Sequence, residues 1–262
     1  MDSMLVFDRD AVRKHRDRAA ATVASVGDLL CDAAERLLDR LDDMTGGFAQ
    51  ALDVGGRGVV APLLRARGIA VVSSDLSTPM ARLDGSCVVA DEEFLPFAPG
   101  SFDLVVASLA LHWINDLPGA LIQLRRVLRP DGLLLASMPA LGSLGELRTA
   151  LTDAELALSG GVSPRVSPFP DLRDCAGLLQ RAGFAAPVVD LEEIVVRYAD
   201  GLQLLRDLRA AGETNAVRAR SRAVAPVGLF PAALAAMRAD DGRVPVTMRL
   251  AMMTGWVAGR SP

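Results

Sequence analysis

The sequence is poor in the residues that build metal centres and disulfide frameworks. It holds three cysteines and two histidines in 262 residues, and no two cysteines form a CxxC pair. An odd number of well-separated cysteines indicates reduced thiols instead of a disulfide framework. With two histidines, a histidine-built metal centre or a Ser-His-Asp triad has almost nothing to draw on. The sequence therefore predicts no metal site.

A basic excess and long hydrophobic runs are also missing. The formal net charge is −4, and no basic stripe of the kind that binds nucleic acid is present. No apolar run approaches the roughly 20 residues needed to span a bilayer, and the first twenty residues lack the apolar core of a secretory signal. Lys14 is the single lysine among 28 basic residues, which is typical of a GC-rich bacterial genome. We expect a cytoplasmic bacterial protein with no nucleic-acid partner and no integral membrane segment.

Short apolar runs alternate with helical patterns between residues 46 and 139. These runs are hydrophobic on both faces, as central strands of a parallel sheet are, and strands that alternate with helices indicate a doubly wound sheet. The expected strands are 51–54, 69–75, 86–90, 102–109 and 133–138, with helices at 59–67 and 117–128 and a turn at 129–132. We therefore predict an α/β, Rossmann-like, mostly parallel fold.

The segments on either side of this core have a different pattern. Residues 1–45 read as an N-terminal arm and helix, with a charged arm over 1–20 and an amphipathic helix over 21–45. Residues 140–262 read as a helical insertion followed by closing strands of the same domain. The expected helices there are 144–158, 171–182, 201–211 and 230–238, and the expected antiparallel strands are 187–198 and 244–257.

Polar and glycine residues fall where the predicted parallel strands end. Asp53 precedes a bend of Gly55, Gly56 and Gly58, in which the absence of Cβ atoms lets the backbone turn sharply and approach a ligand. Ligands of open α/β sheets bind at the carboxyl ends of the strands. A glycine bend alone is weak evidence, because a tight structural turn has the same composition.

Asp75 lies at the end of the second predicted strand, about 20 residues after the glycine bend, where an acidic residue can accept both hydroxyls of a ribose. The alternative is a helix N-cap, for which Ser77 competes. A carboxylate after the third strand, Asp91, can accept from the exocyclic amine of an adenine. Apolar side chains follow it in DEEFLPF, and the alternative there is a solvated acidic turn over a small hydrophobic cluster.

His112 follows the clearest strand of the chain and is the one histidine near the predicted strand ends. It is a candidate general base or orienting residue. The alternative is a packed pair of His112 and Trp113 that shapes the lid of the cleft. Methyl transfer from a sulfonium depends mostly on alignment and seldom on a strong base, which favours the packed pair.

Two longer stretches resemble motifs of the class I S-adenosylmethionine (SAM)-dependent methyltransferases, methyltransferase type 11: ADEEFLPFAPGSFDLVVASLALHWINDLP and LRRVLRPDGLLLASM. DEEFLPF with SLALHWINDLP is similar to a subgroup that holds respiratory complex I assembly-factor methyltransferase-like proteins and biotin-pathway malonyl-carrier-protein O-methyltransferases. VFDRDAVRKHRDRAA, SPRVSPFPDLRDCAGLLQRAGF and GETNAV resemble the assembly-factor branch. The resemblance implies a seven-stranded sheet with an antiparallel C-terminal hairpin and added helices.

The same resemblance implies SAM as the cofactor and gives each site residue a role. The methionine half of SAM would contact Asp53, Gly55 and Gly58, with Gly56 in the same loop. The ribose would contact Asp75, and the adenine would lie beside Asp91 and Glu92. The cleft beside the sulfonium would be lined by Ser108, Leu109 and His112. The family loop usually reads Asp-x-Gly-x-Gly-x-Gly, and here it is one residue shorter. A shorter loop either holds SAM with a shifted backbone or binds it more weakly.

Three functions are compatible with these observations. The first is a SAM-dependent methyltransferase that acts on a protein or on an acyl chain bound to an acyl carrier protein. The second, implied by the assembly-factor branch, is hydroxylation of an arginine on a respiratory complex I subunit, for which oxygen chemistry usually needs a metal or redox partner. The third is a non-catalytic SAM-binding assembly protein.

Overall fold

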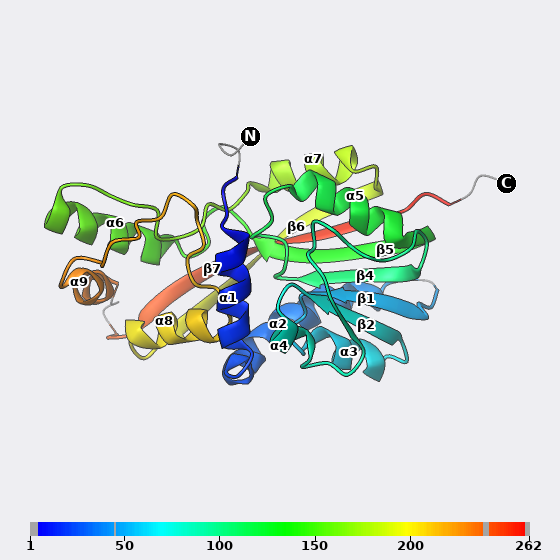
Figure 1. The fold of residues 1–262 in the computed structure, drawn as a ribbon, viewed down its shortest axis with the longest axis horizontal. Coiled ribbons are helices and arrows are strands. Elements are labelled where there is room, and N and C mark those ends of the chain that lie inside the picture. The colour runs from blue at the N-terminus through cyan, green and yellow to red at the C-terminus, as the bar shows by residue number, and fades with distance from the viewer. Residues whose placement is uncertain (1–4, 45, 238–240, 260–262) are drawn as a thin grey trace.

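Seven strands form one mixed sheet in a computed structural model that describes residues 5–44, 46–237 and 241–259 (Figure 1). The strand order is β3-β2-β1-β4-β5-β7-β6. The strands are β1 Gln50–Val54, β2 Ala70–Asp75, β3 Cys87–Val89, β4 Phe102–Ser108, β5 Leu128–Pro139, β6 Ala185–Tyr198 and β7 Val244–Trp256. β1 to β5 pair in parallel, and β7 pairs antiparallel with both β5 and β6. The predicted fold class is confirmed.

The helices follow the predicted order, with three corrections. They are α1 Arg9–Ala19, α2 Gly27–Leu38, α3 Val60–Ala66, α4 Thr78–Ala81, α5 Leu117–Val127, α6 Gly145–Ser159, α7 Leu172–Arg181, α8 Gly201–Ala210 and α9 Leu229–Ala236, with short 3₁₀ turns η2 Val23–Val26 and η3 Asp39–Leu41. The expected charged arm is a helix, α1, and α4 was not expected at all. The expected turn at 129–132 lies inside β5 as an irregularity in its pairing with β4, with Asp131 at φ +63°. Residues 1–4, 45 and 238, which belong to the expected arm and helices, lie outside the described residues.

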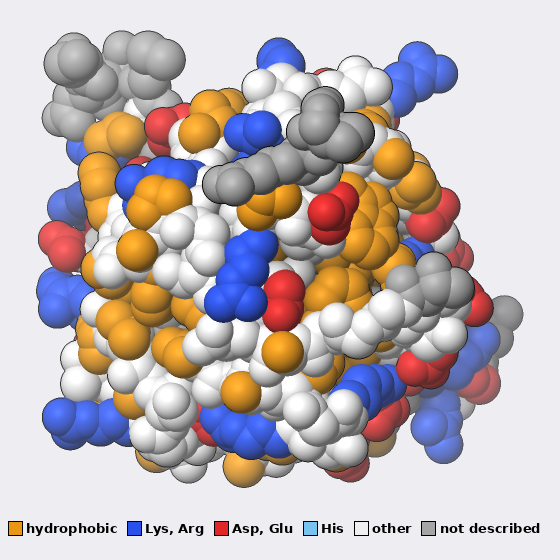
Figure 2. All heavy atoms as spheres, turned by 90° about the vertical axis from the view of Figure 1, so that its right-hand side faces the viewer, with side chains coloured by type: hydrophobic (Ala, Val, Ile, Leu, Met, Phe, Trp, Pro, Cys, Tyr) orange, Lys and Arg blue, Asp and Glu red, His pale blue; other side chains and the backbone are white. Residues whose placement is uncertain are grey.

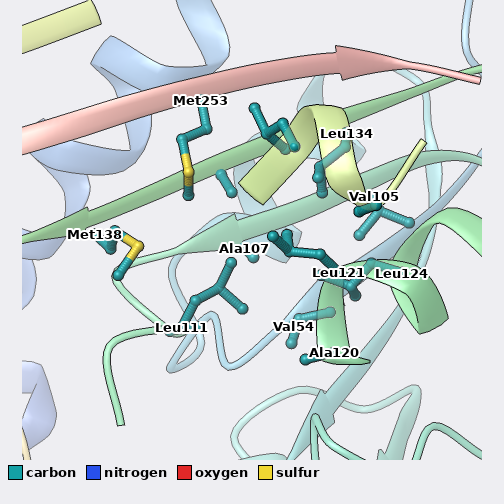
Figure 3. Close-up of a cluster of buried hydrophobic side chains, with 14 of the residues drawn as sticks. Val54, Val105, Ala107, Leu111, Ala120, Leu121, Leu124, Leu134, Met138 and Met253 are labelled. Atoms are coloured by element: carbon teal, nitrogen blue, oxygen red, sulfur yellow. The ribbon is translucent and has the colours of Figure 1, made fainter. Parts of the chain in front are cut away.

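Both faces of the sheet are covered by apolar side chains, as the two-faced hydrophobic strands predict. On one face, strands β4, β5 and β7 pack against α5 and α7 (Figure 3). Leu121 and Leu124 of α5 point toward Val105 and Leu134 of the sheet, and all four are fully buried. On the other face, α2 and α3 cover the same strands. Burial at roughly 25 cal/mol per Å² of apolar surface makes these two layers the main stabilising contribution.

The two antiparallel strands extend beyond the rest of the sheet. β7 pairs with β6 from Val244 to Trp256 but with β5 only from Leu250 onward. The segment Val244–Arg249 is therefore half of a two-stranded ribbon. Helices α6, α8 and α9 gather around this ribbon and form a separate apolar cluster with it, visible on the left of Figure 1. We call α6, α8, α9 and the ribbon the C-terminal lobe.

Basic and acidic side chains are interspersed on the face that lies on the right of Figure 1, at the ends of the strands opposite α1 (Figure 2). None of the helices in the described part of the chain is both long enough and apolar enough to cross a membrane.

Candidate active site

The glycine bend after β1 is tightly packed. Gly55, Arg57 and Gly58 have φ of +64°, +51° and +77°, a backbone region that favours glycine. A Cβ at Gly56 would collide with the carboxylate of Asp53, and a Cβ at Gly55 would lie 2.9 Å from the Cβ of Ala110. The shortened loop therefore packs closely against Asp53 of β1 and against Ala110. Arg57, a non-glycine residue in this loop, has a left-handed backbone conformation.

Asp53 lies beneath this bend and is fully enclosed. Its Oδ2 accepts a 3.4 Å hydrogen bond from the Ser73 hydroxyl, which also donates to Asp84 at 2.9 Å. Burial raises the pKa of Asp53 to about 7, although the hydrogen bond from Ser73 opposes the shift. The carboxyl group supports the loop from below, and its direct contact with a methionine group stays a prediction.

Asp75 ends β2 and uses both of its oxygens. Oδ1 accepts from the backbone N–H of Ser77 at 2.8 Å, and Oδ2 accepts from Arg16 at 2.8 Å. The N-cap of α4 belongs to Ser77, whose hydroxyl accepts from the N–H of Met80. The competing cap assignment for Asp75 therefore fails, and its carboxylate faces a guanidinium.

Three more arginine contacts hold the acidic segment after β3. Arg9 donates to Asp91 at 2.6 Å and to the carboxylate of Glu92, and Arg16 lies 3.6 Å from Glu92. Arg9 and Arg16 thus join the three acids that were predicted at the ribose and the adenine. Of the apolar side chains that follow in the sequence, Phe94 is 75% exposed and Leu95 is buried.

Both arginines come from α1. Asp8 caps this helix by accepting from the N–H of Ala11. The first turn carries the acidic Asp10 and the last turn the basic Arg16 and Arg18, as the helix dipole favours. Its buried side chains are Ala11, Val12, Arg16 and Ala19. The helix crosses the carboxyl ends of the parallel strands, between the sheet and the C-terminal lobe (Figure 1).

Ser108 ends β4, and Leu109 follows it. The Ser108 hydroxyl is buried 3.5 Å from that of Ser137, which accepts from the N–H of Leu109 at 3.1 Å. The carbonyl oxygen of Leu109, a residue at φ +51°, accepts from Arg57 at 3.1 Å. Arg57 thereby connects the glycine bend to the end of the central strand.

Glu213, between α8 and α9, closes the other side of the cleft. Its Oε2 accepts from Nε2 of His112 at 2.6 Å and from Nε1 of Trp113 at 2.7 Å, and its Oε1 accepts from Arg57. Burial alone would raise the pKa of Glu213, but the interactions of its carboxylate with His112 and with the charge of Arg57 outweigh burial and lower the pKa. Because an ionised carboxylate only accepts, Nε2 of His112 carries a proton. Nδ1 of His112 is buried and has no hydrogen-bond partner within the described residues.

A cavity of about 180 Å³ opens between this network and the C-terminal lobe. Arg57, His112, Trp113 and Glu213 are among the residues that line it. The remaining lining is mostly apolar and comes from α2, β6, β7, α6 and α8, for example Leu30, Ile194, Leu147, Met248 and Leu208. The cavity therefore joins the predicted cofactor cleft to an apolar chamber.

Sequence reasoning missed four residues of this site: Arg9, Arg16, Arg57 and Glu213. The residues around Arg16 were assigned to a charged arm, and Arg57 lies in the glycine bend, where only the glycines and Asp53 were given roles. Glu213 lies in the GETNAV segment, which carried a resemblance but no role. Among residues 5–44, 46–237 and 241–259, no group of three or more His, Cys, Asp or Glu could hold a metal ion.

The fold and the cleft at its strand ends define a Rossmann-like methyltransferase. The chain is similar to solved structures with this fold, including YcgJ from Bacillus subtilis, which has a TM-score of 0.58 at 13% identity and covers 86% of this chain and 98% of that one. Another is a methyltransferase from Haloferax volcanii solved with the activator Trm112, with a TM-score of 0.57 at 16% identity over 96% of this chain and 99% of that one.

Sequence comparison gives the family. Residues 52–136 match the family described as "Methyltransferase domain". The chain is 39% identical to the arginine-hydroxylase NDUFAF5 of Danio rerio over 97% of this chain and 83% of that protein. It is 35% identical to the malonyl-[acyl-carrier protein] O-methyltransferase of Laribacter hongkongensis over 100% of this chain and 94% of that enzyme. The chain belongs to the SAM-dependent methyltransferase family that includes these proteins, and its cofactor is SAM.

The types of residue at the strand ends are suited to binding SAM. A glycine bend, a carboxylate at the end of β2 and two carboxylates after β3 meet at one edge of the sheet. Buried polar atoms without a partner among the described residues, Nε of Arg57 and Nδ1 of His112, add unused hydrogen-bonding capacity beside the cavity. The carboxylates of Asp75 and Glu92 are already paired with Arg16.

Proposed function

We propose that this enzyme transfers a methyl group from SAM to an acceptor whose apolar part occupies the cavity, and that the acceptor is a carrier-bound acyl chain or a protein segment. The observation that carries this proposal is the continuity between the two sites. Arg57, Leu109 and His112 border both the predicted cofactor cleft and the apolar cavity. A group held in the cavity can therefore present its reactive end beside the glycine bend.

The lining of the cavity favours an acyl chain. Most of its side chains are aliphatic, and Arg57, His112 and Glu213 are among the polar and charged side chains of the lining. Ligand pockets of this kind bind an apolar body through area burial and fix its orientation through a few polar groups. The malonyl-[acyl-carrier protein] O-methyltransferases among the relatives act on a carrier-bound acyl group by name, which supports an acyl carrier protein as the partner.

Asp75, Asp91 and Glu92 would hold the adenosyl part of SAM, and the bend from Gly55 to Gly58 would face the methionine part. When bound, SAM supplies an activated methyl group on a sulfonium. The contribution of the protein is mainly alignment, because methyl transfer needs the acceptor atom in line and close to the methyl carbon.

His112 is the proposed catalytic residue, and Glu213 is its positioning residue. The hydrogen bond to Glu213 keeps the proton on Nε2, so Nδ1 of a neutral His112 has a free lone pair. That nitrogen can accept a proton or a hydrogen bond from an acceptor hydroxyl, amine or carboxylic acid. Trp113, bound to the same Glu213 oxygen, fixes the angle of the pair.

The test is methyl incorporation from labelled SAM, with malonyl-acyl carrier protein and a bacterial lysate as separate acceptors. We expect labelled product with one of them, a loss of about 10²-fold or more in His112→Asn, and full activity in Glu193→Gln, an exposed acid that pairs with Arg249. No incorporation with any acceptor, from protein shown to bind SAM by calorimetry, would contradict the proposal. A mass spectrum of natively purified protein adds a direct search for retained SAM or S-adenosylhomocysteine.

A second candidate is hydroxylation of an arginine side chain, with a respiratory complex I subunit as the partner. The arginine-hydroxylases NDUFAF5 are 37–39% identical to this chain over nearly all of it. In the structure, Glu213 already holds one guanidinium, that of Arg57, at the mouth of the cavity. Insertion of an oxygen atom needs O₂ and an electron donor. A product arginine that gains the mass of one oxygen atom, instead of one methylene, would select this reaction, and a fully active cell phenotype in His112→Asn would point to a non-catalytic assembly role.

A further inference from the structure

Arg16 reaches the three features that were predicted to bind three different parts of the cofactor. Its Nη1 lies 2.8 Å from Oδ2 of Asp75 and 3.6 Å from Oε1 of Glu92. The same nitrogen would lie 3.1 Å from a Cβ placed on Gly55, so it rests directly on the glycine bend. The residue is 1% exposed. One guanidinium thus spans the ribose acid, an adenine acid and the methionine loop.

The position of the helix that carries Arg16 is fixed on both sides. The backbone of Phe7, before the helix, exchanges two hydrogen bonds with the side chain of Asn115, at 2.8 and 3.1 Å. Next to Arg16, Asp17 accepts from the hydroxyl of Ser77 at 2.6 Å. These contacts anchor α1 to the sheet, so the group that can move within the cleft is the Arg16 side chain.

A guanidinium buried to this extent requires an anionic partner. Burial opposes the charged form, but the carboxylates of Asp75 and Glu92 outweigh it and raise the pKa of Arg16. Ribose hydroxyls and Arg16 compete for the same oxygens of Asp75, because Oδ1 also serves Ser77. If Asp75 turns to a ribose, Arg16 needs another anion. SAM carries one anionic group, the α-carboxylate of its methionine half, and that half is the one expected at the glycine bend.

We propose that Arg16 is a cofactor-binding residue that exchanges partners: it gives up Asp75 to the ribose and pairs with the α-carboxylate of the cofactor. This inference rests on the proposed binding of SAM at the strand ends. It explains how a cleft with paired carboxylates admits an adenosyl group without leaving a buried charge alone. Charge-assisted pairs of arginine with carboxylate are among the stronger hydrogen bonds. A pair with Arg16 therefore favours a ligand that carries the α-carboxylate over a ligand that lacks it.

The test is calorimetry with two ligands that differ by one group, S-adenosylhomocysteine and its decarboxylated analogue. Arg16→Ala is compared with wild type and with Arg13→Ala, a matched control on the exposed side of the same helix, where Arg13 pairs only weakly with Asp10. In wild type and Arg13→Ala, S-adenosylhomocysteine should bind at least about tenfold more tightly than the analogue. In Arg16→Ala, the preference for S-adenosylhomocysteine over the analogue should fall to less than about threefold. The α-carboxylate of the ligand then has no arginine to pair with, and Asp75 is free to bind the ribose of both ligands.

Arg16→Gln, which keeps most of the side-chain volume, gives the same comparison if Arg16→Ala does not fold. An unchanged preference in the Arg16 variants, or equal tightening of both ligands, would overturn the exchange while leaving SAM binding intact. Failure of wild type to bind S-adenosylhomocysteine at all would instead overturn the proposed function and this inference with it.

Discussion

The cleft has two halves, and they differ in the charge of the side chains that the core of residues 46–139 contributes. In the half proposed to bind the adenosyl group, here called the adenosyl half, the core supplies the acids Asp75 and Glu92, and the cation Arg16 comes from α1. In the half proposed to bind the methyl acceptor, here called the acceptor half, the core supplies the cationic Arg57 and the histidine His112, and the acid Glu213 comes from the segment after α8. Each half is completed by a segment outside the predicted core of residues 46–139. The central motifs alone therefore do not make this site, and both terminal segments have to dock on the strand ends.

Glu213→Ala should break the acceptor half with the largest effect. It leaves Arg57 buried without its acid and removes the partner of His112, and breaking a buried pair costs about 3–5 kcal/mol in the free energy of unfolding. We expect that loss by urea denaturation, with at least about 10²-fold lower methyl transfer. Glu193→Ala, which removes an exposed acid of a surface pair with Arg249, should change the free energy by less than about 1 kcal/mol. Equal losses of unfolding free energy in Glu213→Ala and Glu193→Ala would show that the contacts of Glu213 with Arg57 and His112 are not the cause of the loss.

Asp75→Ala and Asp91→Ala should weaken the adenosyl half without affecting the acceptor half. Each removes one or two hydrogen bonds to the adenosyl group, so the affinity for SAM should fall by roughly a few-fold to a hundredfold in calorimetry. His112→Asn should leave this affinity within about twofold, because His112 belongs to the acceptor half. Unchanged SAM affinity in both aspartate variants would mean that the cleft assignment is wrong.

Asp53 and Glu213 should make stability depend on pH in opposite directions. The pKa of Asp53 is about 7 in the folded state and 3.8 in the reference state, so the folded protein holds this proton more tightly. Stability from Asp53 is therefore present at low pH and lost as the pH rises from about 4 to about 7. Glu213, with a lowered pKa, contributes stability that is present above its reference value of 4.5 and lost at lower pH.

Asp53→Asn isolates the first of these effects. The variant should unfold several degrees above wild type at about pH 8, and the difference should shrink toward zero at about pH 4. Thermal unfolding of both proteins across this range measures it. A difference between the two midpoints that stays constant over the whole pH range would exclude titration of Asp53 as the cause.

Trp113→Phe is the mildest test of the acceptor half. It removes the 2.7 Å hydrogen bond to Glu213 but keeps an aromatic ring against Phe7, whose centroid lies 5.3 Å away. The expected cost is about 1 kcal/mol, or roughly 2–4 °C in the unfolding midpoint. A loss as large as that of Glu213→Ala would place the main stabilising contact of the network on Trp113 instead of Arg57 and His112.

The sheet could be predicted from the sequence because its strands are apolar on both faces and are punctuated by glycine and aspartate. The edge that gathers Asp75, Asp91 and Ser108 follows from the same pattern, since carboxyl ends of parallel strands share one edge. Helix α1 could not be predicted, because a basic run with one narrow apolar face reads as a solvated arm. Its buried arginine, Arg16, becomes intelligible only beside the acids it meets.

Glu213 was unpredictable for a different reason. It is about one hundred residues away from His112 in the sequence and lies in a loop with no periodic pattern, so only the packing of the C-terminal lobe reveals the pair. The direct roles of all the predicted site residues toward SAM or the acceptor stay predictions. So do the division of the chain into 1–45, 46–139 and 140–262 and the cytoplasmic location.

The antiparallel ribbon of β6 and β7 has a consequence for how acceptor preference can change. Ile194, Val196, Val246 and Met248 of the ribbon form one wall of the cavity, yet the ribbon segment Val244–Arg249 has no hydrogen-bonded neighbour in β5. Substitutions there alter the width and depth of the chamber without disturbing the register of the parallel strands. Changes to this wall can therefore alter which acceptor the chamber holds while the carboxyl ends of the parallel strands stay in place.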